Sequence, residues 1–362
     1  MTPDPQFYYV AAAGLLGVRT NIKDFKWSYG TAMPEATADE FQNCRLRLTV
    51  ELDRNLELPP CSERLGKYHY WSGSEGSDAI YYDRTFMFGR QLRLAAQGLC
   101  GVEPTIRVNG AYLRYVTHRF MNLHSLGYIL TDLASLMLLH QGFAPIHCSA
   151  FQAGNATVVV AAPPNTGKTL TSVSACMNRG AKFIAEDLAI TDGTNVYSIP
   201  WTSTFRYYSD IDKSWGARFG NAAKSIFPPL ELIRGSHPRP ITEYLPPEQF
   251  ADNQRVTHVV VLERGESGVR TIGDDEAFQK LRNLNRYEFN YCRAPMLVAH
   301  EFFNPKLDIE GAHRAEAEIL QTLASNADET LAVTTLDPPR YADLILEALG
   351  ERAADNSIAV AA

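Results

Sequence analysis

The first 115 residues of the chain alternate between short apolar runs and polar, turn-forming segments. The apolar or alternating runs are FYYVAAAGLL, RLRLTVEL, AIYYDRTFMF and TIRVNGAYLRYV, and segments such as ELPPCSE and SGSEGSD separate them. Short runs of this kind, bounded by Gly, Pro, Ser and Asp, are typical of β-strands. We therefore predict that residues 1–120 form a smaller β-rich (α+β) accessory domain that provides an acceptor or partner surface.

A helical pattern follows over NLHSLGYILTDLASLMLLHQ, residues 122–141. Its apolar side chains recur at spacings of three and four residues. Asn122 is a suitable N-cap residue, and Gly142 follows the expected end. The pattern predicts a helix over 122–141 that packs on a sheet and joins the two halves of the chain.

From about Ala144 the pattern alternates between strands and helices. The β-branched run NATVVVAA precedes PPNTGKT, the helical stretch LTSVSACMNRG follows, and AKFIAED is a short strand that ends in two acids. Strands are also expected at VTHVVVLERG and ADETLAVTTL, and helices at DDEAFQKLRNL, AHRAEAEILQTLASN and PRYADLILEALGE. This order predicts an α/β domain over residues 121–350. Six prolines between Pro228 and Pro247 predict a loop or lid, and residues 351–362 a flexible tail.

Composition and charge narrow the classes of function. The chain has 362 residues, 45% of them hydrophobic and 21% charged, which suits a globular protein of roughly two domains. With 34 Lys and Arg against 41 Asp and Glu, the net charge is −7, so we expect no nucleic-acid partner. No basic segment precedes the first apolar run, and Asp132 interrupts the most apolar helical run. That run is also shorter than the roughly 18 to 20 residues of a bilayer span, so we expect a cytoplasmic protein without a membrane partner.

The six cysteines indicate reduced, mostly buried thiols. They are Cys44, Cys61, Cys100, Cys148, Cys176 and Cys292, and no two stand at zinc-finger spacing. The His300-Glu301 pair lacks the second histidine of a zinc-protease motif. The sequence therefore predicts neither a zinc site nor a catalytic thiol.

The strongest chemical signal is Ala162-Pro-Pro-Asn-Thr-Gly-Lys-Thr169, which matches G-x-x-x-x-G-K-[ST] with Ala in place of the first glycine. In such a loop the backbone N–H groups surround a phosphate, and the positive end of the following helix faces it. The Lys168 ammonium would contact the β- and γ-phosphates, and the Thr169 hydroxyl would bind Mg²⁺. We predict an ATP and Mg²⁺ site whose nucleotide-binding residues are Pro163, Pro164, Asn165, Thr166, Gly167, Lys168, Thr169 and Leu170.

Two adjacent acids, Glu186 and Asp187, end the strand AKFIA, which we expect to lie beside the strand that enters the loop. An acid there can bind the Mg²⁺ that bridges the phosphates, or accept a proton from an attacking hydroxyl. Neighbouring side chains on a strand point to opposite sides, so the two acids could divide these roles. The strand VVVLE, residues 259–263, is a competing candidate for the acidic strand, but the Arg-Gly that follows it resembles an ordinary turn.

The chain resembles the catalytic domain of the HPr kinase/phosphorylase family in the order of its motifs. His147 comes first, then a strand, APPNTGKT, a helix that ends in Arg179-Gly180, and AKFIAED. That family shares its P-loop fold with phosphoenolpyruvate carboxykinase, and peptide-tailoring serine kinases are more distant relatives. The family has an Asp-Asp pair where this chain has Glu186-Asp187. The resemblance is clear over residues 145–190 and weak to about 350.

The resemblance implies a role for each matching residue. Lys168 and the loop amides would hold the phosphates, Thr169 and Asp187 would bind Mg²⁺, Glu186 would be the general base, and His147 would tune that carboxylate. Since HPr kinases are oligomers, it also implies a homo-oligomer.

Several further residues are weaker candidates for the nucleotide and metal site. Glu231 in ELIRG partly matches a family signature and would be a metal ligand, and Arg206 and Arg239 could contact phosphate. The aromatic stretch RYEFNYCRAP, residues 286–295, could stack on a base or hold an acceptor, although such stretches commonly belong to a core.

The interpretation that best fits these patterns is an Mg²⁺-dependent ATP phosphotransferase that acts on a hydroxyl of a protein, a peptide or a small metabolite. Two alternatives stay open: a nucleotide-binding switch or assembly protein with little turnover, and a carboxykinase-like or phosphorylase reaction on the same fold.

Overall fold

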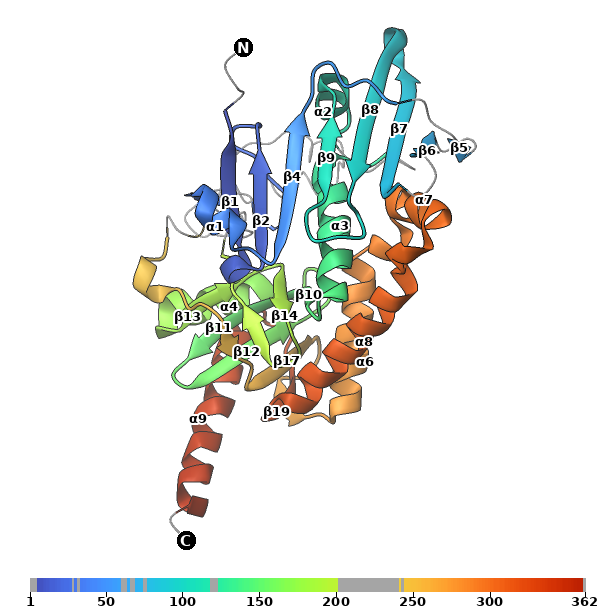
Figure 1. The fold of residues 1–362 in the computed structure, drawn as a ribbon. Coiled ribbons are helices and arrows are strands. Elements are labelled where there is room, and N and C mark those ends of the chain that lie inside the picture. The colour runs from blue at the N-terminus through green and yellow to red at the C-terminus, as the bar shows by residue number, and fades with distance from the viewer. Residues whose placement is uncertain are drawn as a thin grey trace.

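The computed structural model describes residues 5–360 except 28, 31–32, 60–63, 66–68, 74–76, 118–122, 201–240 and 242–243. It has a mixed α/β architecture in which the described residues form three sheets with helices packed around them (Figure 1). This agrees with the α/β class expected from the sequence.

The N-terminal half forms a nine-stranded sheet in the order β3-β1-β2-β4-β9-β8-β7-β6-β5. Strands β2, β4 and β9 are parallel to one another, and the other neighbours are antiparallel. The bounds are β1 Phe7–Ala11, β2 Leu16–Thr20, β3 Glu35–Ala36, β4 Leu46–Leu52, β5 Arg64–Leu65, β6 Tyr70–Ser72, β7 Ala79–Phe86, β8 Arg90–Gln97 and β9 Thr105–Val108.

One hydrophobic core joins this sheet to helices from later in the chain. It includes Leu48 and Ile80 from the sheet, Leu133 from α3 (Leu126–His140), Leu297 from α7 (Pro295–Phe303) and Ile319 from α8 (Ile309–Asn326). The core therefore continues across residue 120, where the sequence pattern places a domain boundary.

Local capping explains two differences from the expected elements. The run TIRVNGAYLRYV is a strand only to Val108, because the Asn109 side chain accepts a hydrogen bond from the Tyr112 N–H and starts helix α2 (Gly110–Tyr115). Helix α3 begins at Leu126 after the N-cap position Ser125, later than the expected 122, and Asn122 lies outside the described residues. Helix α1 (Ala38–Gln42) and helix α7 were not expected from the pattern.

The C-terminal half contains a six-stranded sheet in the order β13-β11-β12-β17-β19-β18 and a four-stranded antiparallel sheet in the order β10-β14-β15-β16. Strands β12, β17 and β19 are parallel, and β11 runs antiparallel between β12 and β13. The bounds are β10 Ala144–Ile146, β11 Cys148–Ala153, β12 Ala156–Ala161, β13 Lys182–Ala185, β14 Ala189–Thr191, β15 Asn195–Tyr197, β16 Gln254–Arg255, β17 His258–Glu263, β18 Gly268–Thr271 and β19 Glu329–Thr334.

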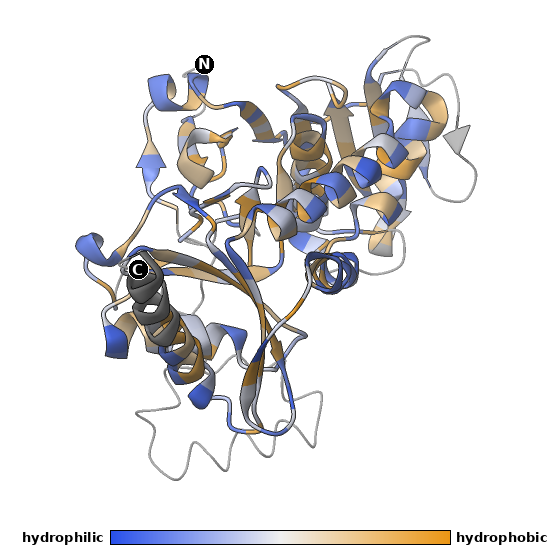
Figure 2. Ribbon diagram, turned by 90° about the horizontal axis from the view of Figure 1, so that it is seen from below, coloured by the Kyte–Doolittle hydropathy of each residue, from blue (hydrophilic) through white to orange (hydrophobic). Residues whose placement is uncertain are grey.

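Amphipathic helices cover this sheet. They are α4 (Lys168–Arg179), α6 (Asp274–Glu288), α8 and α9 (Arg340–Val360). Figure 2 shows strands coloured largely hydrophobic and many helices carrying both colours, as expected where one helix face packs on a sheet. Helix α9 continues to Val360, so residues 351–360 are helical where the sequence predicts a flexible tail. No helix in the described ranges is both long enough and apolar enough to cross a membrane.

The described cysteines are free thiols that differ in exposure. Cys44, Cys148 and Cys176 are buried, Cys292 is half-buried, and Cys100 is exposed. Cys61 lies outside the described residues. The expected burial therefore holds for three of them, and Cys100 is the clear exception.

Candidate functional site

Strand order brings the predicted residues to one edge of the six-stranded sheet. Because β11 is antiparallel to both β12 and β13, the start of β11 lies beside the ends of β12 and β13. His147 precedes β11, the loop 162–167 follows β12, and Glu186 follows β13. The prediction that β13 lies directly beside β12 is wrong: β11 lies between them, and the acids still reach the loop because β13 ends at the same edge.

The loop 162–167 has a tight, fixed backbone. Gly167 has φ of +126°, and a Cβ there would lie 3.0 Å from Pro338 Cβ, so a side chain would be both strained and crowded. Asn165 also has positive φ, +61°, and its carbonyl accepts a 2.6 Å hydrogen bond from Arg264. Arg264 belongs to the Arg-Gly turn after β17, so this turn, which the sequence suggests is ordinary, helps to hold the loop.

Helix α4 begins directly after Gly167, and among the described residues no side chain caps its N-terminus. Its first N–H groups are therefore available to an external acceptor, in the region where the helix dipole favours an anion. Within the loop, Pro163, Pro164 and Asn165 are exposed, Thr166 is buried, and Thr169 and Leu170 at the start of α4 are half-buried.

Lys168 and His147 form a buried pair at this edge. Both side chains belong to residues that are 7% exposed, and Lys168 Nζ lies 2.6 Å from His147 Nε2. The ammonium donates, so Nε2 accepts, and the imidazole carries its proton on Nδ1. Burial and the neighbouring ammonium lower the pKa of His147 to about 4, and burial lowers the pKa of Lys168. Such a buried cation favours an incoming anion, because an anion would offset the cost of its desolvation.

The two acids have different partners. Thr169 Oγ1 donates a 2.5 Å hydrogen bond to Glu186 Oε1, and Glu186 is 7% exposed. The Asp187 side chain is 65% exposed, and its Oδ1 lies 3.7 Å from His147 Nδ1. The backbone of Asp187 has φ of +70°, which turns the chain sharply after Glu186. The pairing is thus the reverse of the one that the resemblance implies: Thr169 meets Glu186, and His147 faces Asp187.

The competing acid at the end of β17 is already paired with cations. Glu263 Oε1 lies 2.6 Å from Lys280 Nζ and 3.6 Å from the Arg270 guanidinium. The Lys280 side chain is about as exposed as that of Glu263, and the Arg270 side chain is more exposed. Glu263 therefore has less freedom than Glu186 or Asp187 to bind a metal.

A buried hydrogen-bond network that the sequence analysis missed supports His147 from helix α6. Asn285 Oδ1 accepts from the His147 backbone N–H, and its amide donates to Pro145 O and to Glu316 Oε1. Glu316 Oε2 accepts a 2.6 Å bond from Tyr291. Asn285 is 1% exposed. A polar amide on the buried face of an amphipathic helix is a sequence signal that could have revealed this network, because buried polar groups are normally hydrogen-bonded.

The aromatic stretch 286–295 contributes Tyr291 to the core, whereas Tyr287 is 74% exposed.

Replacing Asn285 by alanine is expected to lower the free energy of unfolding by about 2–3 kcal/mol, since it leaves the buried Glu316 and Pro145 acceptors without their donor. Asn283 is the matched control, because it lies exposed on the same helix. Its alanine variant should change stability by less than about 0.5 kcal/mol. Urea unfolding curves measure both changes, and equal losses in the two variants would contradict the role of the network.

His147 is expected to make stability sensitive to acid. Its folded-state pKa is depressed, so the unfolded chain takes up a proton near pH 6.5, whereas the folded chain resists it until about pH 4. The free energy of unfolding should therefore fall as pH falls through this window, by about 1.4 kcal/mol per pH unit from this group. The variant His147→Gln should lose that component and run parallel to wild type above pH 7. Parallel curves throughout would show that His147 is not held neutral.

Four features predicted from the sequence lie wholly or mostly outside the residues that the structure describes. Glu231, Arg206 and Arg239, with most of the proline-rich segment 228–247, lie in residues 201–240 and 242–243.

Comparisons with known proteins give little further information. No protein-family model matches the chain, and no curated protein matches it. Among solved structures, the HPr(Ser) kinase/phosphatase from Coxiella burnetii is similar at 13% identity and a TM-score of 0.24. The match covers 35% of this chain and 76% of that one. A similarity this low establishes neither the fold family nor the function.

Proposed function

We propose that this protein is an Mg²⁺-dependent ATP phosphotransferase with an HPr kinase-like P-loop site that transfers the γ-phosphoryl group to a hydroxyl acceptor. The observation that carries the proposal is the convergence of Lys168, His147, Thr169 and the two acids on the uncapped N-terminus of α4.

Phosphate binding is supported by three features of the loop. The positive φ angles of Asn165 and Gly167 give the backbone a tight curve. Arg264 stabilises this curve by donating a hydrogen bond to the Asn165 carbonyl. Within the described part of the chain, no side chain accepts from the N–H groups at the start of α4. The buried Lys168 ammonium adds a positive charge, and its hydrogen-bond partner His147 is neutral and so does not offset that charge.

Magnesium fits the donor set at the base of α4. The Thr169 hydroxyl and the Glu186 carboxylate offer oxygen ligands that lie next to each other, and Mg²⁺ prefers oxygen ligands. When bound, Mg²⁺ would neutralise developing charge on the phosphates. We assign Thr169 and Glu186 to hold it, and this changes the role that the resemblance implies for Glu186.

Asp187 is then the better candidate for the general base. Its side chain is exposed, so an acceptor hydroxyl can approach it, and His147 Nδ1 faces it from within the protein. Asp187 would accept the hydroxyl proton while the oxygen attacks the γ-phosphorus in line, and Lys168 would stabilise the charge on the phosphoryl oxygens. His147 would orient both groups, because its two nitrogens face Lys168 and Asp187.

Calorimetric titration of wild type with Mg·ATP, followed by an acceptor screen, tests the proposal. We expect saturable binding, a KM for ATP between about 1 µM and 1 mM, and ADP formation that requires both Mg²⁺ and a hydroxyl acceptor from a panel of serine peptides and polyols. Phosphorus NMR would identify the phosphate ester. Binding without acceptor-dependent turnover would favour the switch or assembly role, and the absence of binding to ATP and GTP would contradict nucleotide binding altogether.

A further inference from the structure

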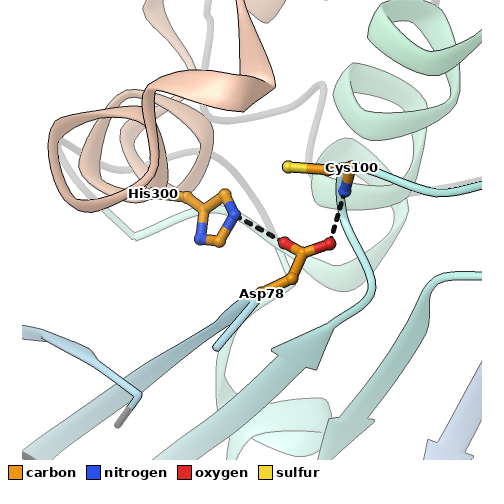
Figure 3. A group of neighbouring side chains, drawn as sticks. All are labelled: Asp78, Cys100 and His300. Carbon is orange, nitrogen blue, oxygen red and sulfur yellow. Dashed lines mark hydrogen bonds and ion pairs between the residues drawn. The ribbon is translucent and has the colours of Figure 1, made fainter. Parts of the chain in front are cut away.

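A group of three side chains of metal-ligand types lies apart from the loop 162–167, where the N-terminal sheet meets helix α7. Asp78 directly precedes β7, Cys100 follows β8, and His300 lies on α7. Their ligand atoms all lie within 4.8 Å of one another. Figure 3 shows the three side chains converging from these separate segments, with Asp78 between the other two.

The hairpin of β7 and β8 explains why two of the three meet. In the antiparallel register Ala79 faces Gln97, so the residue before β7 and the turn after β8 lie at the same end. Gly98 N–H donates to Asp78 O at 2.8 Å, and Cys100 N–H donates to Asp78 Oδ2 at 2.7 Å. These bonds fix the Asp78 carboxylate beside the Cys100 backbone.

His300 completes the group from a position 222 residues away. Its Nε2 lies 2.8 Å from Asp78 Oδ1, and the residue is 1% exposed. The other ring nitrogen, Nδ1, is buried and has no hydrogen-bond partner among the described residues. The Asp78 carboxylate accepts from Nε2–H and so holds the ring proton on Nε2 in the metal-free protein. Nε2 becomes a ligand when that proton moves to the unpaired Nδ1.

We propose that Asp78, Cys100 and His300 bind one divalent transition metal ion of the zinc class, which links the N-terminal sheet to helix α7. The donor set of one imidazole nitrogen, one thiolate and one carboxylate oxygen matches Zn²⁺ and its substitute Co²⁺, and the thiolate disfavours Mg²⁺ and Ca²⁺. In tetrahedral coordination such ligand atoms lie roughly 3.3–3.6 Å apart. The Nε2–Oδ1 pair would open slightly, and the sulfur would move inward.

Metal binding requires one proton to be released and one to move within the site. The Cys100 thiol releases its proton to solvent, the imidazole proton moves from Nε2 to Nδ1, and the ion gains three protein ligands plus one water. Cys100 is exposed and gives the ion a path from solvent, whereas His300 anchors the buried side. The site shares no residue with the loop 162–167, so the two metal preferences can be separated experimentally.

Titration of wild type with Co²⁺ in the presence of excess Mg²⁺ tests the site. We expect one equivalent to bind, with a thiolate-to-cobalt charge-transfer band in the near ultraviolet and intense visible bands typical of four-coordination, and Zn²⁺ should displace it. Cys100→Ser should abolish the charge-transfer band and weaken affinity at least about tenfold. Asp78→Asn should weaken affinity while leaving the band detectable at high Co²⁺.

Two controls keep the result specific. Cys292→Ser removes a half-buried thiol elsewhere and should leave the spectrum unchanged, and Lys168→Ala should bind Co²⁺ like wild type even if nucleotide binding is lost. A wild-type titration without the charge-transfer band would overturn the proposal. A Cys100→Ser spectrum that equals wild type would overturn it as well, and because Cys100 is exposed that variant is expected to fold.

Discussion

Lys168→Ala is expected to reduce phosphoryl transfer by about 10²–10³-fold, because the variant lacks the buried ammonium that would stabilise charge on the phosphoryl oxygens. The variant should also lose most Mg·ATP binding in calorimetry. Its thermal stability should be unchanged or higher, since burial lowers the pKa of Lys168 and a buried ammonium with a neutral neighbour costs free energy in the absence of a ligand.

The combination of lost binding and retained stability separates a phosphate-binding lysine from a structural one. Lys182→Ala is the matched control, because Lys182 is exposed at the start of β13 in the same sheet, and it should leave binding unchanged. A Lys168→Ala variant that binds Mg·ATP like wild type would contradict the phosphate-binding role. A large drop in melting temperature would instead indicate that the lysine chiefly supports His147.

The helices and strands around the loop could be predicted because each has a recognisable pattern within its own residues. The β-branched run of β12, the Gly180 end of α4 and the periodic apolar face of α8 depend on neighbours within a few residues. Pairing is not local: β13 was expected beside β12, and only the intervening β11 hairpin decides otherwise. Helix α7 was missed because its nine residues are too few to show a period, although Pro295 at its start is a suitable signal.

The candidate site was predictable where the motif specifies both residue type and spacing, as for Gly167, Lys168 and Thr169. The partners of the two acids were not predictable, because a change of backbone direction decides which carboxylate reaches Thr169, and the positive φ of Asp187 supplies that change. Asn285 and His300 contact their partners, His147 and Asp78, across more than 100 residues of sequence. No spacing rule applies to such contacts.

Asp187→Asn and Glu186→Gln are expected to damage different steps, because only Glu186 contacts Thr169 and only Asp187 is exposed toward an acceptor. Asp187→Asn should lower kcat by about 10²–10⁴-fold, the usual contribution of a general base, with little change in the Kd for Mg·ATP. Glu186→Gln should raise the Mg²⁺ concentration needed for half-maximal activity, and saturating Mg²⁺ should restore part of kcat. Steady-state kinetics across a Mg²⁺ series measures both effects.

Asp252→Asn controls for the loss of an exposed negative charge outside the site, and it should behave like wild type. If Glu186→Gln instead loses kcat at all Mg²⁺ concentrations and Asp187→Asn shifts the Mg²⁺ requirement, the roles are those that the family resemblance implies. In that case the surroundings of Glu186 must change when nucleotide binds, because the residue is 7% exposed in the free protein and a base must be reached by the acceptor hydroxyl. The two isosteric variants thus decide whether the contacts of the free protein persist in the reacting complex.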